Sequence, residues 1–396
     1  MQVPSIVRRE FLTRSARLAL SLAAGSHVSR VWSGTKVTAW HPKLIPRSQE
    51  PPNLETPVQL LADWITPNEV FFIRCHLAPP DVRLEDWKLQ VTGLVRQPVT
   101  LAMDDLKRLP EITQVVTLEC AGNGRAFFNP RTEGDQWERG AVGTARWTGV
   151  RLADVIRKAG GLPAAKHVVF NGADNTGDES ADFVRSLPIK KAMYPHTMLA
   201  WAMNGQTLPA VHGFPLRLIV PGWTGNHSVK WLAKIELRDG EHAGPSMLQS
   251  YRVPSGLVMP GAPVTPDETK LITALPVKSI ITAPTDGSYV PPGRVRVQGA
   301  AWAGESEVAK VEVSLDNGWA WQPATLGPDT ARYAWRLWHF DWKANEKGSF
   351  LLMARATDSQ GRVQPTTQAW NPDGYLWNVI DQVRVNVGTS SELYFP

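Results

Sequence analysis

The 396-residue chain has little cysteine and no Cys-x-x-Cys-His segment, the motif that attaches a heme covalently. Its two cysteines, Cys75 and Cys120, are too few for a cysteine-based zinc site or a disulfide-rich scaffold. One disulfide between them is the alternative to two free thiols, and two free thiols are the prediction. We therefore expect no heme in this chain and no covalent cross-link.

The chain also lacks any run of eighteen apolar residues, so no membrane-spanning helix is expected. The short apolar stretch 18–24 follows a basic start that includes Arg8 and Arg9, an order typical of a signal peptide. Two adjacent arginines before Phe11 resemble a twin-arginine signal, which exports folded proteins to the periplasm. The alternative is an ordinary basic amphipathic helix.

Outside its first forty residues the chain lacks net charge. Residues 1–40 hold six basic residues against Glu10, which accounts for the whole formal charge of +5. A near-neutral body argues against a nucleic-acid-binding protein, because such a protein needs a basic surface. Any anion-binding site must therefore be a local cluster of arginines.

The order of short apolar segments predicts two domains. From about 65 to 245, strand-like runs alternate with helix-like ones such as 152–158, and no repeated Gly-x-Gly-x-x-Gly unit occurs. This mixture favours an α+β domain over a doubly wound parallel sheet. After a stretch rich in proline and glycine, short strands with regular turns predict a β-sandwich. The predicted boundaries are 1–40 for the signal and lead-in, 41–265 for the first domain, 266–389 for the second domain and 390–396 for a tail.

Cys120 lies between a predicted strand, 115–118, and a loop that contains Gly122 and Gly124. A soft thiolate suits a high-valent transition metal better than calcium or magnesium. Arg125 would favour the thiolate form of the cysteine. The two glycines would allow the backbone to approach a bulky cofactor. A buried, inert thiol is the common alternative for one cysteine beside glycines.

Five segments resemble, in order, motifs of the sulfite oxidase family of molybdopterin enzymes. They are Phe72-Ile73-Arg74-Cys75-His76, Leu118-Glu119-Cys120-Ala121-Gly122-Asn123-Gly124-Arg125, Gly143-Thr144-Ala145-Arg146-Trp147, His212-Gly213-Phe214-Pro215-Leu216-Arg217 and Ser228-Val229-Lys230-Trp231-Leu232. The region from about 270 to 387 resembles the dimerisation domain of that family. The resemblance implies an α+β molybdopterin domain followed by an all-β immunoglobulin-like sandwich, a homodimer, and a single pyranopterin that holds molybdenum.

The resemblance also implies a role for each matched residue. Cys120 is similar to the cysteine that coordinates molybdenum, and Arg74 and Arg125 are similar to arginines that hold the sulfite oxyanion. Tyr251 is similar to the active-site tyrosine, and Trp137 to a tryptophan that lines the substrate pocket. The residues similar to those that bind the pyranopterin and its phosphate are His76, Asp174, His212, Arg217, Ser228 and Lys230.

Alternation along a strand places residues two apart on one face. If 71–76 is a strand, Arg74 and His76 share a face and Cys75 points away from them. Cys75 is then expected to be a structural cysteine. Taken without its motif, each candidate binding residue also has a non-functional interpretation. His212 would be a core histidine, and Lys230 a solvated surface charge.

One departure from the family concerns the second domain. Animal members carry a further substrate arginine near its end, and the corresponding segment here, 370–375, has none. In this respect the chain resembles heme-free bacterial sulfite dehydrogenases. We therefore expect a periplasmic sulfite dehydrogenase that oxidises sulfite to sulfate at molybdenum and passes electrons to an external c-type cytochrome.

Three alternatives stay open. A sulfane dehydrogenase subunit of a thiosulfate-oxidising complex would use the same fold and cofactor on a carrier-bound substrate. A methionine sulfoxide reductase would share the cofactor but is expected to lack the second domain. A periplasmic binding or adhesion protein would use the sandwich without catalysis and would hold no molybdenum.

Overall fold

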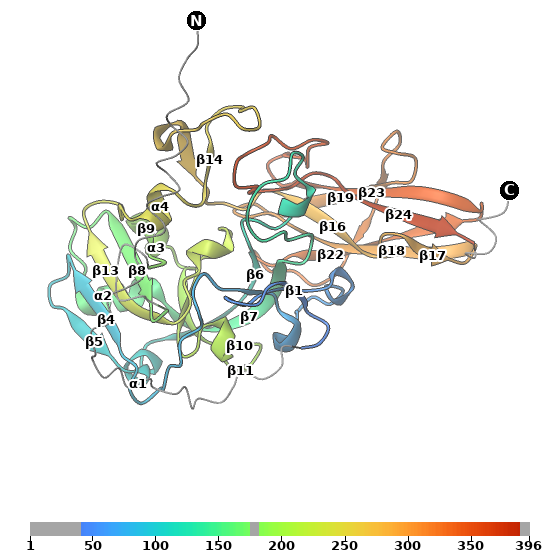
Figure 1. Cartoon of the computed structure of the whole chain (residues 1–396). Coiled ribbons are helices and arrows are strands. Elements are labelled where there is room, and N and C mark those ends of the chain that lie inside the picture. The colour runs from blue at the N-terminus through green and yellow to red at the C-terminus, as the bar shows by residue number, and fades with distance from the viewer. Residues whose placement is uncertain (1–40, 175–181, 389–396) are drawn as a thin grey trace, which may run out of the picture. The chain divides into compact units, whose positions relative to one another are not determined.

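The computed structural model describes residues 41–174 and 182–388, which belong to one compact unit (Figure 1). Strands carry most of the regular structure. None of the helices among these residues is long and apolar enough to cross a membrane. The predicted signal and lead-in at 1–40 and the predicted tail at 390–396 lie outside the described residues.

A five-stranded sheet carries the segment that leads to Cys120. Its order is β11-β10-β7-β6, with β12 also paired to β10. The antiparallel ladder between β6 and β7 ends where Glu119 lies opposite Val142, so Cys120 is the first residue beyond it. The bounds are β6 Glu111–Glu119, β7 Val142–Arg151, β10 Met198–Met203, β11 Gln206–Thr207 and β12 Arg217–Ile219.

A second five-stranded sheet has the order β5-β4-β13-β8-β9, in which β4 and β13 are parallel. Side chains of both sheets share one core, which includes Val91 of β4, Phe170 of β8, Leu199 of β10 and Leu218 of β12. Burial of this apolar core holds the two sheets together. The bounds are β4 Leu89–Gly93, β5 Val99–Leu101, β8 His167–Gly172, β9 Arg185–Pro188 and β13 Leu232–Arg238.

The helices that accompany these sheets are short. α2 (Leu152–Ala159) confirms the predicted helix at 152–158, and its buried residues Leu152, Val155 and Ile156 recur at helical spacing. The helix ends at Gly160, whose φ of +67° favours glycine. The other helices are α1 Met103–Lys107, α3 Ile189–Ala192 and α4 Pro245–Leu248, with 3-10 turns η1 Val58–Leu60, η2 Asn68–Val70, η3 Arg125–Phe127, η4 Ala210–His212, η5 Gly225–His227 and η6 Pro266–Glu268.

Two small sheets complete this part of the chain. One is built from β1 (Ile45–Ser48), β2 (Asn53–Glu55) and β3 (Ile73–Arg74), and the other from β14 (Arg252–Pro254) and β15 (Thr269–Leu271). Strand β3 is two residues long and ends at Arg74. The condition of a strand over 71–76 is therefore not met, and strand alternation does not reach Cys75 and His76.

Two further sheets build the second domain, with orders β16-β18-β22-β21 and β17-β24-β23-β19-β20. Their side chains meet in one core, with Val297 and Trp338 from the first sheet and Val313 and Leu352 from the second. The domain is thus mostly β, as predicted. The bounds are β16 Lys278–Ala283, β17 Ser288–Val290, β18 Gly293–Trp302, β19 Val308–Ser314, β20 Gln322–Pro323, β21 Thr325–Leu326, β22 Arg336–Ala344, β23 Gly348–Asp358 and β24 Asp381–Val387.

Strand β6 of the first domain is bonded directly to the second domain. The backbone N–H of Thr117 donates to the carbonyl oxygen of Tyr333 (2.8 Å), and the N–H of Trp335 donates to Thr117 Oγ1 (2.8 Å). Val142 of β7 shares an apolar cluster with Trp302 and Trp335. The end of β6 is therefore fixed from the second domain, just before Cys120.

We predict that Leu352→Ala destabilises the protein by about 2–5 kcal/mol, because the fully buried side chain leaves a cavity between the two sheets of the second domain. Guanidinium unfolding of the whole chain, followed by tryptophan fluorescence, measures the loss. Lys343→Ala, at an exposed position of β22, is the matched control and should change stability by less than about 0.5 kcal/mol. Equal losses in the two variants would contradict the prediction.

Candidate functional site

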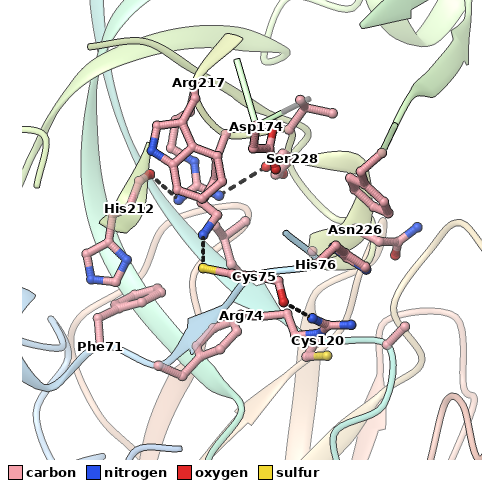
Figure 2. A pocket seen from close by; sticks show the side chains of 18 of the residues that line it. Phe71, Arg74, Cys75, His76, Cys120, Asp174, His212, Arg217, Asn226 and Ser228 are labelled. Carbon is pink, nitrogen blue, oxygen red and sulfur yellow. Dashed lines mark hydrogen bonds between the residues drawn. The ribbon is translucent and has the colours of Figure 1, made fainter. Parts of the chain in front are cut away.

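One pocket gathers nine of the eleven residues that the sequence singles out, and it holds about 730 Å³ of empty space, which includes its open mouth. Volumes of this size suit a cofactor or a substrate of moderate size. The walls come from segments far apart in the chain (Figure 2). The nine residues are Arg74, His76, Cys120, Asp174, His212, Arg217, Ser228, Lys230 and Tyr251.

Cys120 is placed in the pocket by a tight turn at the end of β6. Its N–H donates to the carbonyl oxygen of Ala141 (2.9 Å), and its own carbonyl accepts from the N–H of Asn123 (2.9 Å). Both cysteines are free, as predicted.

The two glycines after Cys120 make room for side chains of the protein itself. A Cβ atom on Gly122 would lie 2.7 Å from Arg125 Nη2, and one on Gly124, where φ is +97°, would lie 2.5 Å from Trp377 Cδ1. The structure thus gives both glycines a packing role, where the sequence analysis had assigned them to cofactor approach.

The Cys120 thiol is surrounded by opposing electrostatic influences. Burial raises its pKa above the usual range, while the guanidinium groups of Arg74 and Arg125 act to lower it. The effect of burial is the larger one, and the pKa of the thiol is raised. The positive charge of Arg125, which was expected to favour the thiolate, is therefore not sufficient to keep Cys120 deprotonated. A bound metal cation is the additional positive charge that would hold this sulfur as thiolate.

A group of cations lies at the other end of the pocket in Figure 2, where Arg217, Asp174 and Ser228 are labelled. Arg217 donates from Nη1 to the carbonyl of His212 (2.8 Å) and from Nη2 to that of Ser228 (3.1 Å). Lys230 Nζ donates to Cys75 Sγ (3.1 Å) and to the carbonyl of Val211 (2.9 Å). The acceptors of the two side chains are therefore three backbone carbonyls and one sulfur.

Burial shifts the pKa values at this end of the pocket. It lowers the pKa of Arg217 to about 9 and that of His212 to about 3, and it also lowers the pKa of Lys230. His212 is therefore a neutral imidazole at physiological pH. Burial raises the pKa of Asp174 to about 7, although Lys230 opposes the rise. Among the described residues of the pocket wall, this one carboxylate faces three cations, Arg74, Arg217 and Lys230.

These residues fit a cofactor that carries an anionic group and a metal. Arg217 Nε is buried and has no hydrogen-bond partner among the described residues, and neither amide atom of Asn226 has one. Buried donors of this kind demand an acceptor. In the described part of the chain no three His, Cys, Asp or Glu side chains are arranged to hold a metal ion. A metal beside Cys120 would therefore need further ligands from the cofactor itself.

His76 and Tyr251 form a linked pair in the pocket wall. His76 Nε2 is hydrogen-bonded to the Tyr251 hydroxyl, and the imidazole stacks on Phe183 with ring centroids 3.7 Å apart. Burial and the charge of Arg74 lower the pKa of His76 well below its usual range. Tyr251 adopts a φ of +58°, which is uncommon for a residue with a side chain and is often found at functional sites.

Arg125 and Trp137 do not line the pocket. Arg125 is buried, donates from Nε to the carbonyl of Asp373 (2.7 Å) and from Nη1 to that of Asp135 (3.0 Å), and lies over the Tyr375 ring. Trp137 is fully buried in an apolar cluster of the first domain. Their predicted contacts with substrate stay predictions.

The predicted orientation of Cys75 is wrong. Strand alternation would direct its side chain away from those of Arg74 and His76, but all three residues line the pocket, because β3 ends before Cys75. Cys75 is 1% exposed, and its sulfur accepts from Lys230. Its expected structural role therefore takes the form of a hydrogen-bond acceptor for a cation of the site.

The structure adds Phe183, Asn226 and Arg185 to the residues of this region. Phe183 and Asn226 line the pocket. Arg185 is fully buried behind Tyr251, with its Cζ atom 5.1 Å from the ring centroid. Its Nε and Nη2 have no hydrogen-bond partner among the described residues. No clear signal in the sequence marked Arg185, because β9, which begins at this residue, reads Arg-Ser-Leu-Pro and is not an apolar strand.

Comparisons with known proteins agree with this arrangement. A family described as the oxidoreductase molybdopterin binding domain matches residues 76–246, and one described as the Mo-co oxidoreductase dimerisation domain matches residues 269–388. The mitochondrial sulfite oxidase of Macaca fascicularis is 39% identical over 88% of this chain. This chain spans 66% of the length of that relative, slightly less than two thirds.

Two further proteins resemble the chain along nearly their whole length. A sulfite oxidase of Arabidopsis thaliana is 31% identical over 89% of this chain and 96% of its own length. The crystal structure of the sulfane dehydrogenase SoxCD from Paracoccus pantotrophus has a TM-score of 0.76 and 29% identity, covering 93% of this chain and 96% of that chain. The likeness therefore includes both domains of the present chain.

We predict that Cys75→Ala lowers stability by about 1–3 kcal/mol, because it leaves the partly buried ammonium of Lys230 without its sulfur acceptor. Cys75→Ser is the matched variant and should recover part of the loss, since its hydroxyl also accepts a hydrogen bond. Thermal unfolding of the two variants measures the difference. Equal stabilities of Cys75→Ala and the unaltered protein would refute the role given to Cys75.

Proposed function

The chain belongs to the sulfite oxidase family of molybdopterin oxidoreductases, and from this membership we propose that it oxidises sulfite to sulfate. The observation that carries the proposal is the convergence of Cys120 and Arg74 in one pocket with the cations Arg217 and Lys230. This pocket combines a soft sulfur ligand, a guanidinium for an oxyanion and positive charge for a phosphate.

The residues that would hold the cofactor are divided between the two ends of the pocket. Cys120 would supply a sulfur ligand to molybdenum, and the cofactor, when bound, supplies the two-electron redox chemistry. Arg217, Lys230 and Ser228 would bind the phosphate and pterin, together with His76, Asp174 and His212. The unpartnered Nε of Arg217 supports this assignment, because a buried guanidinium N–H needs an acceptor.

Arg74 would bind the sulfite oxyanion. Its guanidinium lines the pocket and is anchored by Asn53 Oδ1 (3.3 Å) and by the carbonyl of Cys75. Burial acts to lower the pKa of Arg74, but the nearby Tyr251 and Cys120 groups outweigh it, and the pKa lies above its ordinary value. The side chain is therefore always charged, which suits a dianionic substrate.

Tyr251 and Arg125 would act beside Arg74. The hydrogen bond between His76 and Tyr251 holds the Tyr251 hydroxyl at the pocket wall, from where it would donate to an oxygen of the substrate. Arg125 contributes a fixed positive charge near Cys120, as its effect on the thiol pKa indicates. Trp137 supports the wall from the core behind the pocket.

The location and the partners of the enzyme belong to the same proposal. The paired arginines Arg8 and Arg9 support twin-arginine export to the periplasm. The lack of a Cys-x-x-Cys-His segment supports transfer of electrons to an external c-type cytochrome rather than to a heme of this chain. The matched dimerisation domain supports a homodimer, and its two sheets over one core support an immunoglobulin-like sandwich.

A second candidate is a sulfane dehydrogenase that acts on carrier-bound sulfur. The structural likeness to the sulfane dehydrogenase over 96% of that chain favours it. The two functions differ in substrate size, so steady-state assays with free sulfite and with a thiosulfate-modified carrier separate them. Rapid oxidation of free sulfite by the purified chain would favour the sulfite dehydrogenase over the sulfane dehydrogenase.

We predict that Cys120→Ser abolishes sulfite-dependent reduction of cytochrome c, because serine replaces the soft sulfur ligand with a hard oxygen. Turnover should fall at least about a hundredfold, in line with loss of a ligand and of substrate positioning. Stopped-flow absorbance of the cytochrome measures turnover, and elemental analysis measures molybdenum per chain. Cys75→Ser is the control for loss of a pocket thiol, and near-native turnover of Cys120→Ser would sink the proposal.

We also predict that Arg217→Met lowers the amount of bound molybdopterin, because it removes the buried guanidinium assigned to the phosphate. A loss of about tenfold in cofactor content is expected for one charge-assisted contact of this kind. Fluorescence of the extracted, oxidised pterin measures it without reference to activity. Arg146→Met, at an exposed position of β7, is the matched control and should keep full content.

A further inference from the structure

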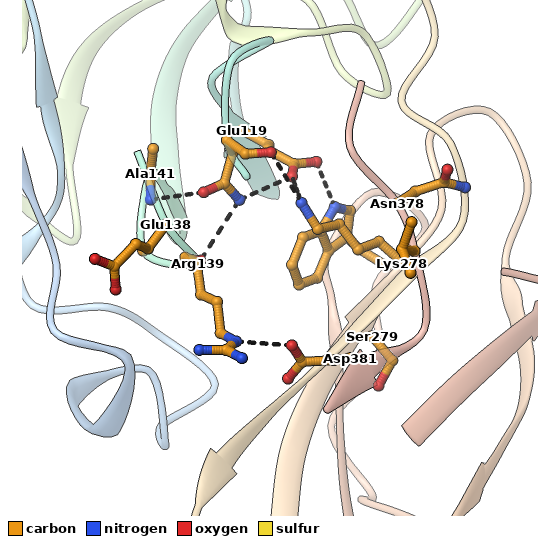
Figure 3. A network of polar contacts seen from close by, with 12 residues as sticks. Glu119, Glu138, Arg139, Ala141, Lys278, Ser279, Asn378 and Asp381 are labelled. Carbon is orange, nitrogen blue, oxygen red and sulfur yellow. Dashed lines mark hydrogen bonds and ion pairs between the residues drawn. The ribbon is translucent and has the colours of Figure 1, made fainter. Parts of the chain in front are cut away.

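The carboxylate of Glu119, the residue before Cys120, is buried and fully bonded. Oε1 accepts from Lys278 Nζ (2.8 Å) and from Asn123 Nδ2 (2.9 Å), and Oε2 accepts from Trp302 Nε1 (2.7 Å). Figure 3 shows Glu119 and Lys278 facing each other across this network. Two of the three donors, Lys278 of β16 and Trp302 of β18, come from the second domain.

Lys278 reaches both sides of the turn that contains Cys120. Its Nζ donates to the carbonyl of Asn123 (3.2 Å) as well as to Glu119. Asn123 Oδ1 in turn accepts from the N–H of Ala141 (3.1 Å). One ammonium group therefore fixes the residue before Cys120 and the residue three positions after it.

This ion pair is buried at both ends. Lys278 is 3% exposed and Glu119 is 4% exposed. Loss of one partner would leave the other charge buried without compensation, which disturbs the surroundings of that charge. Because strand β6 ends at Glu119, a shift of this side chain moves the start of the Cys120 turn.

The second domain also contacts the other side of the same turn. The N–H of Leu376 donates to the carbonyl of Ala121 (2.9 Å). Trp377 packs where a side chain on Gly124 would lie. The carbonyl of Asp373 accepts from Arg125. Groups of the second domain thus hold residues 119–125 from two directions.

We propose that the second domain, beyond any role in dimerisation, positions the metal ligand Cys120 through the bonds of Lys278 and Trp302 to Glu119. The inference rests on the proposed function, in which Cys120 binds molybdenum. Lys278 and Glu119 are positioning residues, because neither lines the pocket or touches substrate. Outer-shell partners that orient a metal ligand tune the metal and its chemistry without contacting it.

A second ion pair between the two domains provides a matched control. Arg139 Nε donates to Asp381 Oδ1 (2.7 Å), and Asp381 Oδ2 accepts from the N–H of Ile281 (2.8 Å). Asn123 Nδ2 donates to the backbone carbonyl of Arg139 (3.5 Å), but the side chains of Arg139 and Asp381 make none of the bonds to Glu119 or Asn123 described above (Figure 3). Asp381→Asn therefore weakens the contact between the domains and leaves the Cys120 turn in place.

The test compares Lys278→Met with Asp381→Asn in the full-length, cofactor-loaded protein. We expect Lys278→Met to change the electron paramagnetic resonance spectrum of the half-reduced molybdenum centre and to lower kcat about ten- to a hundredfold, with the KM for sulfite nearly unchanged. Asp381→Asn should keep the native spectrum and kcat. A common structural effect would instead lower the thermal stability of both variants and leave both spectra native.

A double variant, Glu119→Gln with Lys278→Met, covers the case in which Lys278→Met does not fold, since it leaves no unpaired buried charge. Its spectrum should also depart from native. Native spectra and native kcat in every folded variant that lacks Lys278, with molybdenum present in the unaltered protein, would overturn this inference alone. A lack of molybdenum in the unaltered protein would refute the proposed function and remove the premise of the inference with it.

Discussion

Strand β6 ends in a buried carboxylate, and the geometry of the site depends on what that carboxylate binds. Glu119 is the last residue of the ladder with β7, and one backbone bond beyond it, from the Cys120 N–H to the Ala141 carbonyl, holds Cys120 itself. Lys278 and Trp302 of the second domain add a further constraint through the side chain of Glu119. A buried pair of this kind costs desolvation and contributes specificity of position more than stability. The second domain is therefore bonded directly to Glu119, the residue that precedes the proposed metal ligand.

Two cations of the pocket wall, Arg217 and Lys230, and the nearby Arg125 bond mainly to backbone carbonyl groups. Arg217 bonds the carbonyls of His212 and Ser228, Lys230 bonds that of Val211, and Arg125 bonds those of Asp135 and Asp373. A carbonyl satisfies an N–H donor without cancelling its charge, whereas a carboxylate would cancel it. The positive charge of the region therefore stays available to anionic groups, which in the proposed function are a cofactor phosphate at one end and an oxyanion near Cys120 at the other. This arrangement explains how a chain with a near-neutral body can offer a strong local anion site.

Most residues of the pocket could be predicted from the sequence. The contacts that hold these residues in position could not. The matched motifs contain Cys120, Arg74 and most of the residues assigned to the cofactor phosphate. These residues could be predicted because each motif is a short continuous segment of the sequence. Strand alternation failed at Cys75, since the length of β3 is set by its pairing with β2 and not by the local pattern. The pair between Glu119 and Lys278 was not predictable, because its partners are 159 residues apart and only the folded chain brings them together. The resemblance also assigned roles to Arg125 and Trp137. Packing of Arg125 against Tyr375 and of Trp137 in the core, which the sequence does not show, decides where each side chain lies.

The histidines of the pocket contribute hydrogen-bonding geometry rather than charge. Burial lowers the pKa of His212 to about 3 and lowers that of His76 well below its usual range, so both rings are neutral near pH 7. A neutral imidazole can accept at one nitrogen and donate at the other, which a protonated ring cannot do. His76 can therefore orient the Tyr251 hydroxyl without adding a positive charge beside Arg74. Because burial keeps the histidines neutral, the positive charge of the site comes from arginine and lysine. The histidines instead fix the direction of hydrogen bonds.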